Sequence, residues 1–270
     1  MSFQPVVPLS GWAGWKFLER TRQAQQEAFD RSAVIERETT YFTERIAAVR
    51  SASELVADRR LLAVALGAFG LDDDIANRFF IRKVLEEGTR DPQALANRLS
   101  DARYREFSKA FGFGDLDPPN TVLSDFGASI AARYRERQFE IAVGRQDQTM
   151  RLALTLEREL SSIAGTQTTD DGRWFLVMAK PPLREVFETA LGLPASLGAL
   201  DLDRQMSEFR RAASTRLGEA EISQFARPEQ REALLRLYLA RASPAAAAVS
   251  AAGGATVALS LLQSMTSSNG

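Results

Sequence analysis

The sequence contains no histidine and no cysteine in 270 residues. Without cysteine the chain can form neither a disulfide nor a thiolate nucleophile, and without histidine it lacks the usual general base near neutral pH. Serine–histidine and cysteine–histidine catalytic arrangements and the common zinc sites are therefore excluded. Carboxylate and lysine chemistry stay open, so the two absences lower the expectation of an enzyme but do not remove it.

An excess of charge of either sign is also missing, because 34 Lys and Arg stand against 35 Asp and Glu. Proteins that bind nucleic acid or anionic membranes carry a basic excess or patch, so we expect neither partner. The first 20 residues hold one short apolar run, broken by Pro8 and Ser10 and followed by the basic residues. This order predicts no cleavable signal peptide.

Period-2 strand patterns are absent, whereas apolar side chains recur with the period of an α-helix. Such stripes run through residues 104–111, 152–163 and 202–217. The one short run with strand-like composition, 174–178, fits a buried helix equally well. The sequence therefore predicts an all-α, multi-helical bundle.

Proline, glycine and acidic residues mark the expected helix boundaries. Asp91–Pro92 and Pro228 are typical of helix starts, and Gly88 and Gly218 occupy positions typical of helix ends. The three aspartates 72–74 lack the ligand spacing of an EF-hand. We interpret them as the start of a helix, where they supply a cap and complement the helix dipole.

One short sequence motif occurs three times: an apolar, helix-like segment is followed by glycine and then by an apolar residue. It ends at Gly70–Leu71, at Gly112–Phe113 and at Gly192–Leu193. A helix that is closed by a left-handed glycine with a hydrophobic contact beyond it has this signature. The first and third copies also leave open an internal duplication with two pseudo-repeated helical halves.

Composition divides the chain into four parts. Residues 1–36 form a polar N-terminal arm or helix with few large apolar residues, which we expect not to repay the entropy of ordering alone. A first helical half covers 37–116 and a second covers 117–242. The tail, 243–270, is uncharged and rich in Ala, Ser and Gly, and its composition predicts no membrane insertion.

The remaining candidates for chemistry are interpreted as structural. Gly112–Gly114 lacks the third glycine and the preceding strand of a dinucleotide-binding motif, and is read as a turn. The i,i+4 pairs within 82–87 are typical of a solvated helix face. Lys180 has apolar neighbours in sequence, so a catalytic lysine is conceivable, but we expect a loop lysine. Glu157 and Glu159 fall on different helix faces and do not form a carboxylate pair.

Aromatic residues are concentrated between residues 79 and 113. Because no Lys or Arg alternates with them on one face, they predict a core and not a base-stacking surface. The set that we expect to pack as one cluster is Phe79, Phe80, Val84, Tyr104, Phe107 and Phe111. The sequence thus predicts no catalytic, cofactor-binding or metal-ligating residue, and no cofactor.

As a whole, the chain from about Arg37 to Arg241 resembles the bacterial family catalogued as domain of unknown function 1217. The residues that carry the resemblance are Arg37–Thr39, Tyr41, Ile46–Ser51, Leu55, Asp58–Leu61, Ala68–Leu71, Phe80–Gly88, Asp91–Pro92, Leu95–Asp101, Arg103–Tyr104, Phe107, Ala110–Phe111, Arg151–Leu154, Glu157–Arg158, Thr189–Pro194, Asp203 and Gln205. The acidic turn 72–74 and the pair Arg227–Pro228 depart from the family pattern.

The resemblance implies an association with flagella, since members of this family often occur beside flagellar genes. It brings no catalytic residues. We expect a non-enzymatic helical interaction protein of the flagellum or its assembly, cytoplasmic or flagellum-associated, with flagellar or export-apparatus proteins as partners. The arm and the tail, whose apolar tip is 257–262, would be its docking elements. A cytoplasmic regulatory or export-adaptor module is the alternative, followed by a carboxylate-based enzyme.

Overall fold

The computed structural model describes residues 3–242, and within this range the chain forms thirteen α-helices, five short 3-10 helices and no strand. The all-α prediction is confirmed. The segment 174–178, which could have been a strand, lies in a helix. The uncharged tail with its apolar tip falls outside the described residues.

The α-helices are α1 (Gly11–Asp30), α2 (Ala33–Arg45), α3 (Ala52–Ala57), α4 (Arg59–Gly67), α5 (Arg78–Glu87), α6 (Leu95–Arg98), α7 (Ala102–Phe111), α8 (Phe126–Gly144), α9 (Gln148–Ala164), α10 (Asp170–Met178), α11 (Pro181–Leu191), α12 (Leu202–Leu217) and α13 (Pro228–Ala242). The 3-10 helices are Ile46–Ala48, Asp72–Ala76, Asn120–Val122, Ala195–Ala199 and Ile222–Ala226.

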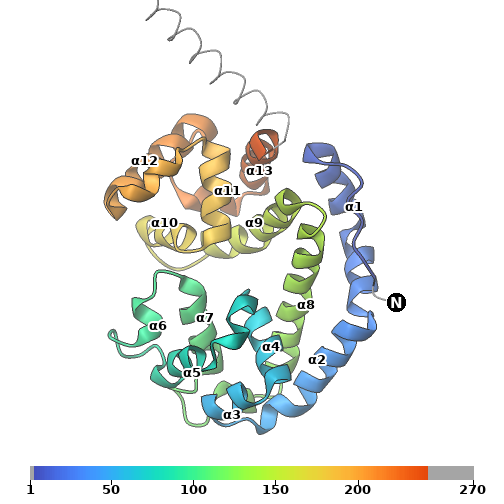
Figure 1. The fold of residues 1–270 in the computed structure, drawn as a ribbon. Helices are drawn as coiled ribbons and strands as arrows, with labels where there is room; N and C mark the ends of the chain where they lie inside the picture. Colours follow the sequence, from blue (N-terminus) through green and yellow to red (C-terminus); the bar gives the residue numbers. More distant parts are fainter. Residues whose placement is uncertain (1–2, 243–270) are drawn as a thin grey trace, which may run out of the picture.

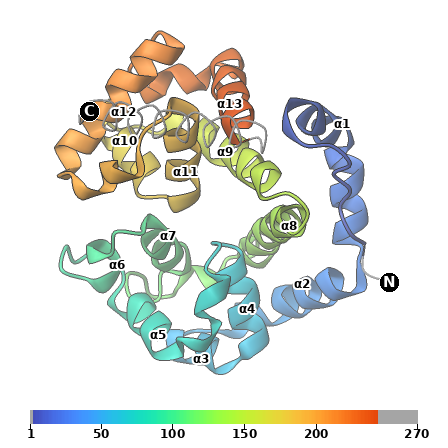
Figure 2. The ribbon, with the colours of Figure 1, turned by 45° about the horizontal axis from the view of Figure 1, so that its top comes forward.

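The helices form two groups joined by α8. The first group, α3 to α7, and the second group, α9 to α13, lie at opposite ends of the molecule (Figure 1). Helix α8 packs against α2 and α4 on one side and α9 on the other, while α1 runs along the outside and reaches α13. Figure 2 shows the two groups facing each other with α8 beside them. Side chains on α8 are therefore close to both groups.

One continuous apolar core runs through both groups, from Trp15 to Leu239. Each group contains its own aromatic centre. In the first, Phe107 and Phe111 have ring centroids 5.0 Å apart. In the second, the rings of Trp174 and Phe187 meet edge to face at 5.6 Å. Such aromatic pairs add stability beyond the area that they bury.

The expected aromatic cluster is confirmed for Phe80, Tyr104, Phe107 and Phe111, whereas Phe79 is exposed and Val84 is buried outside this cluster. Phe107, Phe111 and Val84 are buried, and the partly buried rings of Phe80 and Tyr104 pack edge to face at 5.2 Å. Phe79 is 72% exposed. The prediction was wrong because the buried face of α5 passes through its later apolar residues, and Phe79 points about 100° away from Phe80 around the helix.

Two expected helix starts are also corrected. Asp91–Pro92 opens a turn in which the Ala94 amide donates to the Asp91 carbonyl at 2.9 Å, and α6 begins only after it. The aspartates 72–74 lie in a 3-10 helix and cap no α-helix. Their carboxylates have tertiary roles instead: Gln138 donates to Asp72 at 2.7 Å and the Tyr104 hydroxyl donates to Asp74 at 2.6 Å.

The N-terminal segment is a helix of the body and not a free arm. Helix α1 buries Trp15, Leu18 and Phe29 in the core. A buried glutamine, Gln25, ties the preceding segment to the helix, because it accepts from the Val6 amide at 2.6 Å and donates to the Val6 carbonyl at 3.1 Å. The expectation that this segment lacks the apolar residues to order without a partner is therefore wrong.

The three recurring glycine motifs end helices as predicted. Gly70, Gly112 and Gly192 all have positive φ angles. After α4 and α11 the residue that follows the glycine makes the same backbone hydrogen bond to the last turn of the helix. The Leu71 amide donates to the Leu66 carbonyl at 3.0 Å, and the Leu193 amide donates to the Glu188 carbonyl at 2.9 Å. This is the Schellman arrangement, in which a left-handed glycine satisfies the last carbonyls of a helix.

The order of elements occurs twice along the chain. Helices α2, α3 and α4, a 3-10 helix and α5 are matched by α9, α10 and α11, a 3-10 helix and α12, except that the 3-10 helix Ile46–Ala48 after α2 has no counterpart after α9. In both sets the first and third helices pack against each other. The duplication, and the domain boundaries drawn from the sequence, stay predictions.

None of the helices within residues 3–242 combines the length and the apolar character that crossing a membrane requires.

Candidate functional site

A cleft of about 560 Å³ lies between the two groups of helices, beside α8. Its walls come from the turn after α4, from α7, α8 and α9, and from the residue that precedes α11. The cationic residues in its lining are Lys109, Arg133, Arg137, Arg158 and Lys180. The carboxylates are Glu106, Glu136 and Glu159. This volume is typical of sites for small molecules.

Glu159 is the centre of a buried ion network at this cleft. Lys180 Nζ lies 2.5 Å from its Oε2 and Arg137 Nη2 lies 2.9 Å from its Oε1, while Arg158 also donates to Oε1. Burial opposes ionisation of the carboxyl, but these three positive charges outweigh it and lower the pKa of Glu159 to about 2. Glu159 is therefore ionised at any physiological pH.

A second carboxylate lies behind the first. Glu140 accepts from Arg158 Nε at 2.7 Å and from Arg158 Nη2 at 3.1 Å, a two-pronged geometry that favours an ionised pair. The Thr155 hydroxyl donates to Glu140 at 3.1 Å. Burial, together with the repulsion of Arg158, lowers the pKa of Arg137. These contacts fix α8 and α9 against each other.

Lys180 links the two helical groups. Its Nζ also lies 2.7 Å from Oε1 of Glu106 on α7, so one ammonium group bridges a carboxylate from each group. Beside it, the Ala102 amide donates to the Ala179 carbonyl at 3.3 Å. Lys180 lies in the short connection between α10 and α11, as expected of a loop lysine, but its side chain is buried. No spacing in the sequence reveals its partners, because the fold alone brings them together.

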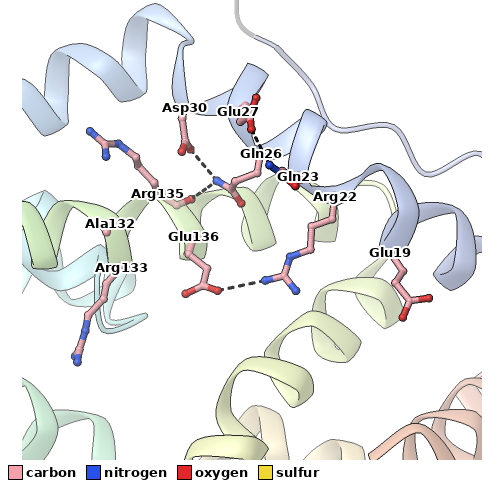
Figure 3. Close-up of a pocket in the computed structure, with 10 residues that line it drawn as sticks. All are labelled: Glu19, Arg22, Gln23, Gln26, Glu27, Asp30, Ala132, Arg133, Arg135 and Glu136. Atoms are coloured by element: carbon pink, nitrogen blue, oxygen red, sulfur yellow. Dashed lines mark hydrogen bonds and ion pairs between the residues drawn. The ribbon is translucent and has the colours of Figure 1, made fainter. Parts of the chain in front are cut away.

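A second hollow, an open groove of about 560 Å³, runs between α1 and α8 (Figure 3). Long polar side chains of both helices form its walls. Arg22 Nη2 pairs with Glu136 Oε1 at 3.2 Å across the groove. Gln26 donates to Asp30 at 2.7 Å and to the Arg135 carbonyl at 3.3 Å. Since Glu136 lines both the groove and the cleft, α8 forms a wall of each.

The other motifs singled out in the sequence lie apart from this charged centre. Gly112–Gly114 forms a turn after α7. Arg82–Glu86 and Lys83–Glu87 are solvent-exposed pairs at 3.6 Å, as predicted. Within residues 3–242 no group of three acidic side chains has the geometry to hold a metal ion. Glu157 is only partly buried whereas Glu159 is buried, which agrees with the prediction that the two lie on different faces of their helix.

Comparison with solved structures finds a crystal structure of a protein from Agrobacterium tumefaciens that is 27% identical in sequence. The similarity covers 88% of this chain and 97% of that one, with a TM-score of 0.71. No curated protein matches the sequence. The model of the family described as Protein of unknown function (DUF1217) matches residues 68–230. That match spans more than half of the sequence, and the chain belongs to this family.

Proposed function

We propose that this chain is a non-enzymatic helical interaction protein that works with flagellar or export-apparatus proteins, and that the α1–α8 groove receives the partner. The flagellar element rests on the gene neighbourhood typical of the family. The groove supplies the structural support, because it is an open channel with two helical walls. A partner helix or extended peptide can lie along such a channel.

The chemistry of the groove indicates the kind of segment that fits. Its walls present both signs of charge and several amides, for example Glu19, Gln23, Glu27 and Arg133 (Figure 3). Gln23 donates to Glu27 at 3.2 Å, Glu27 also lies 4.0 Å from the Arg31 guanidinium, and both Gln23 and Glu27 are exposed. A polar partner segment of mixed charge would gain hydrogen bonds here and cover the aliphatic stems of the long side chains.

A carboxylate-based enzyme is the second candidate, because the cleft holds two carboxyls with oppositely shifted pKa values. Burial raises the pKa of Glu136, whereas that of Glu159 is lowered. Paired acids and bases in active sites show such a contrast. However, Glu159 is a weak base at a pKa of about 2 and faces three cations, and Glu136 is held by Arg22. General-base catalysis needs a pKa closer to the working pH, so interaction remains the better-supported function.

Site-specific photo-crosslinking in motile cells tests this proposal. A photoreactive residue replaces Gln23 in the groove, and a matched variant carries it at Arg204, an exposed position on α12. We expect a flagellar or export-apparatus protein to be crosslinked from position 23 and not from position 204. Equal crosslinking from both positions, or crosslinks from position 23 to other proteins only, would contradict it.

A further inference from the structure

The cleft between the two helical groups has more positive charge than its own carboxylates neutralise. Five cationic side chains line it against three carboxylates. Glu159 and Glu106 are both engaged by Lys180, and Glu136 is paired across the groove with Arg22. Every carboxylate that lines the cleft thus has a cationic partner, and some cationic side chains of the lining are left without a carboxylate partner.

Two of the cations have no such partner. Within residues 3–242, Lys109 on α7 and Arg133 on α8 form neither an ion pair nor a hydrogen bond, and both are exposed. The Arg133 guanidinium is held over the ring of Phe69, with its carbon 5.5 Å from the ring centroid. The two cations therefore come from different walls of the cleft, and a buried aromatic ring at its edge orients one of them.

The cleft also offers a neutral donor and apolar surface. Ser162 of α9 contributes a hydroxyl, and Ala68, Phe69 and Ala110 contribute apolar contacts. Phosphate oxygens are bound by this combination of Arg, Lys and hydroxyl donors. A phosphate monoester carries close to two negative charges at neutral pH, which matches the two unpaired cations. The volume of about 560 Å³ leaves room for an organic group beside the phosphate.

We infer that this cleft binds a small organic phosphate, with Lys109, Arg133 and Ser162 as the contacts to the phosphoryl group. The buried network of Glu159 forms the rigid floor of the site, since its charges are already paired. The ligand would contact α7, α8 and α9 together and so tie the first helical group to the second. Arg133 lines both this cleft and the α1–α8 groove, but the inference does not require the proposed interaction with flagellar proteins.

Calorimetric titration of the full chain with inorganic pyrophosphate tests the inference, with succinate as a dicarboxylate comparison. The variant Lys109→Gln/Arg133→Gln removes the two unpaired cations. Arg31→Gln/Arg204→Gln removes the same charge from exposed positions away from the cleft. We expect pyrophosphate to bind the wild type and the Arg31/Arg204 variant equally, and the Lys109/Arg133 variant at least about tenfold more weakly.

Three results would overturn the inference: no pyrophosphate binding to the wild type, equal weakening in both variants, or succinate binding as tight as pyrophosphate. Both variants change exposed side chains only, so unfolding midpoints in urea should match the wild type. If the Lys109/Arg133 variant unfolds early, Ser162→Ala and Lys109→Gln alone serve as the test. Retained affinity in both single variants would also overturn the inference.

Discussion

Lys180 Nζ lies 2.5 Å from Oε2 of Glu159, and less than a tenth of the lysine side chain is exposed. The same ammonium group reaches Glu106 of the first helical group at 2.7 Å. A buried ion pair of this kind costs desolvation energy, so its presence is weak evidence of added stability. Its geometry, however, makes the loss of either partner costly, because the other charge is then left buried without compensation.

The first prediction concerns Glu159→Gln. The amide cannot neutralise Lys180, Arg137 and Arg158, which then repel one another in a buried site. We expect the free energy of unfolding to fall by roughly 3–5 kcal/mol in urea titrations. The exposed carboxylate of Glu27 provides the control, since Glu27→Gln should change stability by less than about 0.5 kcal/mol. Equal effects of the two substitutions would mean that the network is not a buried unit.

The second prediction is the pH dependence of stability. The folded-state pKa of Glu159, about 2, lies below its ordinary value of 4.5. Its contribution is therefore present above about pH 4.5 and is lost as the pH falls toward 2. Glu159→Gln should flatten the stability profile in this window by about 3 kcal/mol. A variant whose profile stays parallel to that of the wild type between pH 5 and 2 would show that Glu159 titrates normally.

The third prediction separates two phenylalanines of the first helical group. Phe107 is fully buried, whereas Phe79 is 72% exposed beside Arg82. Phe107→Ala should destabilise the chain by roughly 3–5 kcal/mol, the usual loss for a buried phenylalanine. Phe79→Ala should cost less than about 1 kcal/mol. Thermal and urea unfolding of both variants measures this difference, and a similar loss in each would contradict the described packing.

The fourth prediction tests whether α1 belongs to the core. Trp15→Ala should lower the free energy of unfolding by roughly 3–5 kcal/mol, because the Trp15 side chain on α1 is buried in the core. Val34→Ala, at a half-exposed position on α2, should lower it by less than about 1 kcal/mol. A wild-type urea midpoint for Trp15→Ala would mean that the N-terminal helix is separate from the body.

The sequence predicted the helices because their apolar stripes and glycine ends are local patterns. It misjudged α1 because the polar residue Gln25 interrupts the apolar stripe that contains Trp15, Leu18 and Phe29. Gln25 is buried only because the preceding segment folds back along α1, so that the Val6 amide donates a hydrogen bond to it. The buried face of α5 could have been predicted from its later apolar residues, and Phe79 would then have been assigned to the exposed face.

The charged cleft could not have been predicted in this way. Glu159 and Lys180 are 21 residues apart, and Glu106 lies on a helix of the other group. No local period connects them, so only the packing of α7, α9 and the start of α11 reveals the network. Sequence patterns report which face of a helix is apolar, and not which charged residues of distant helices meet.

The most direct measurement of the central claim, function through the α1–α8 groove, is the swimming of cells whose only copy of the chain carries Ala132→Trp. Ala132 is an exposed residue of the groove wall, so an indole there occupies the space of a partner. Ala57→Trp makes the same change at an exposed position on α3. The account predicts impaired swimming for Ala132→Trp only, with wild-type unfolding midpoints for both purified variants. Normal swimming with Ala132→Trp would contradict it.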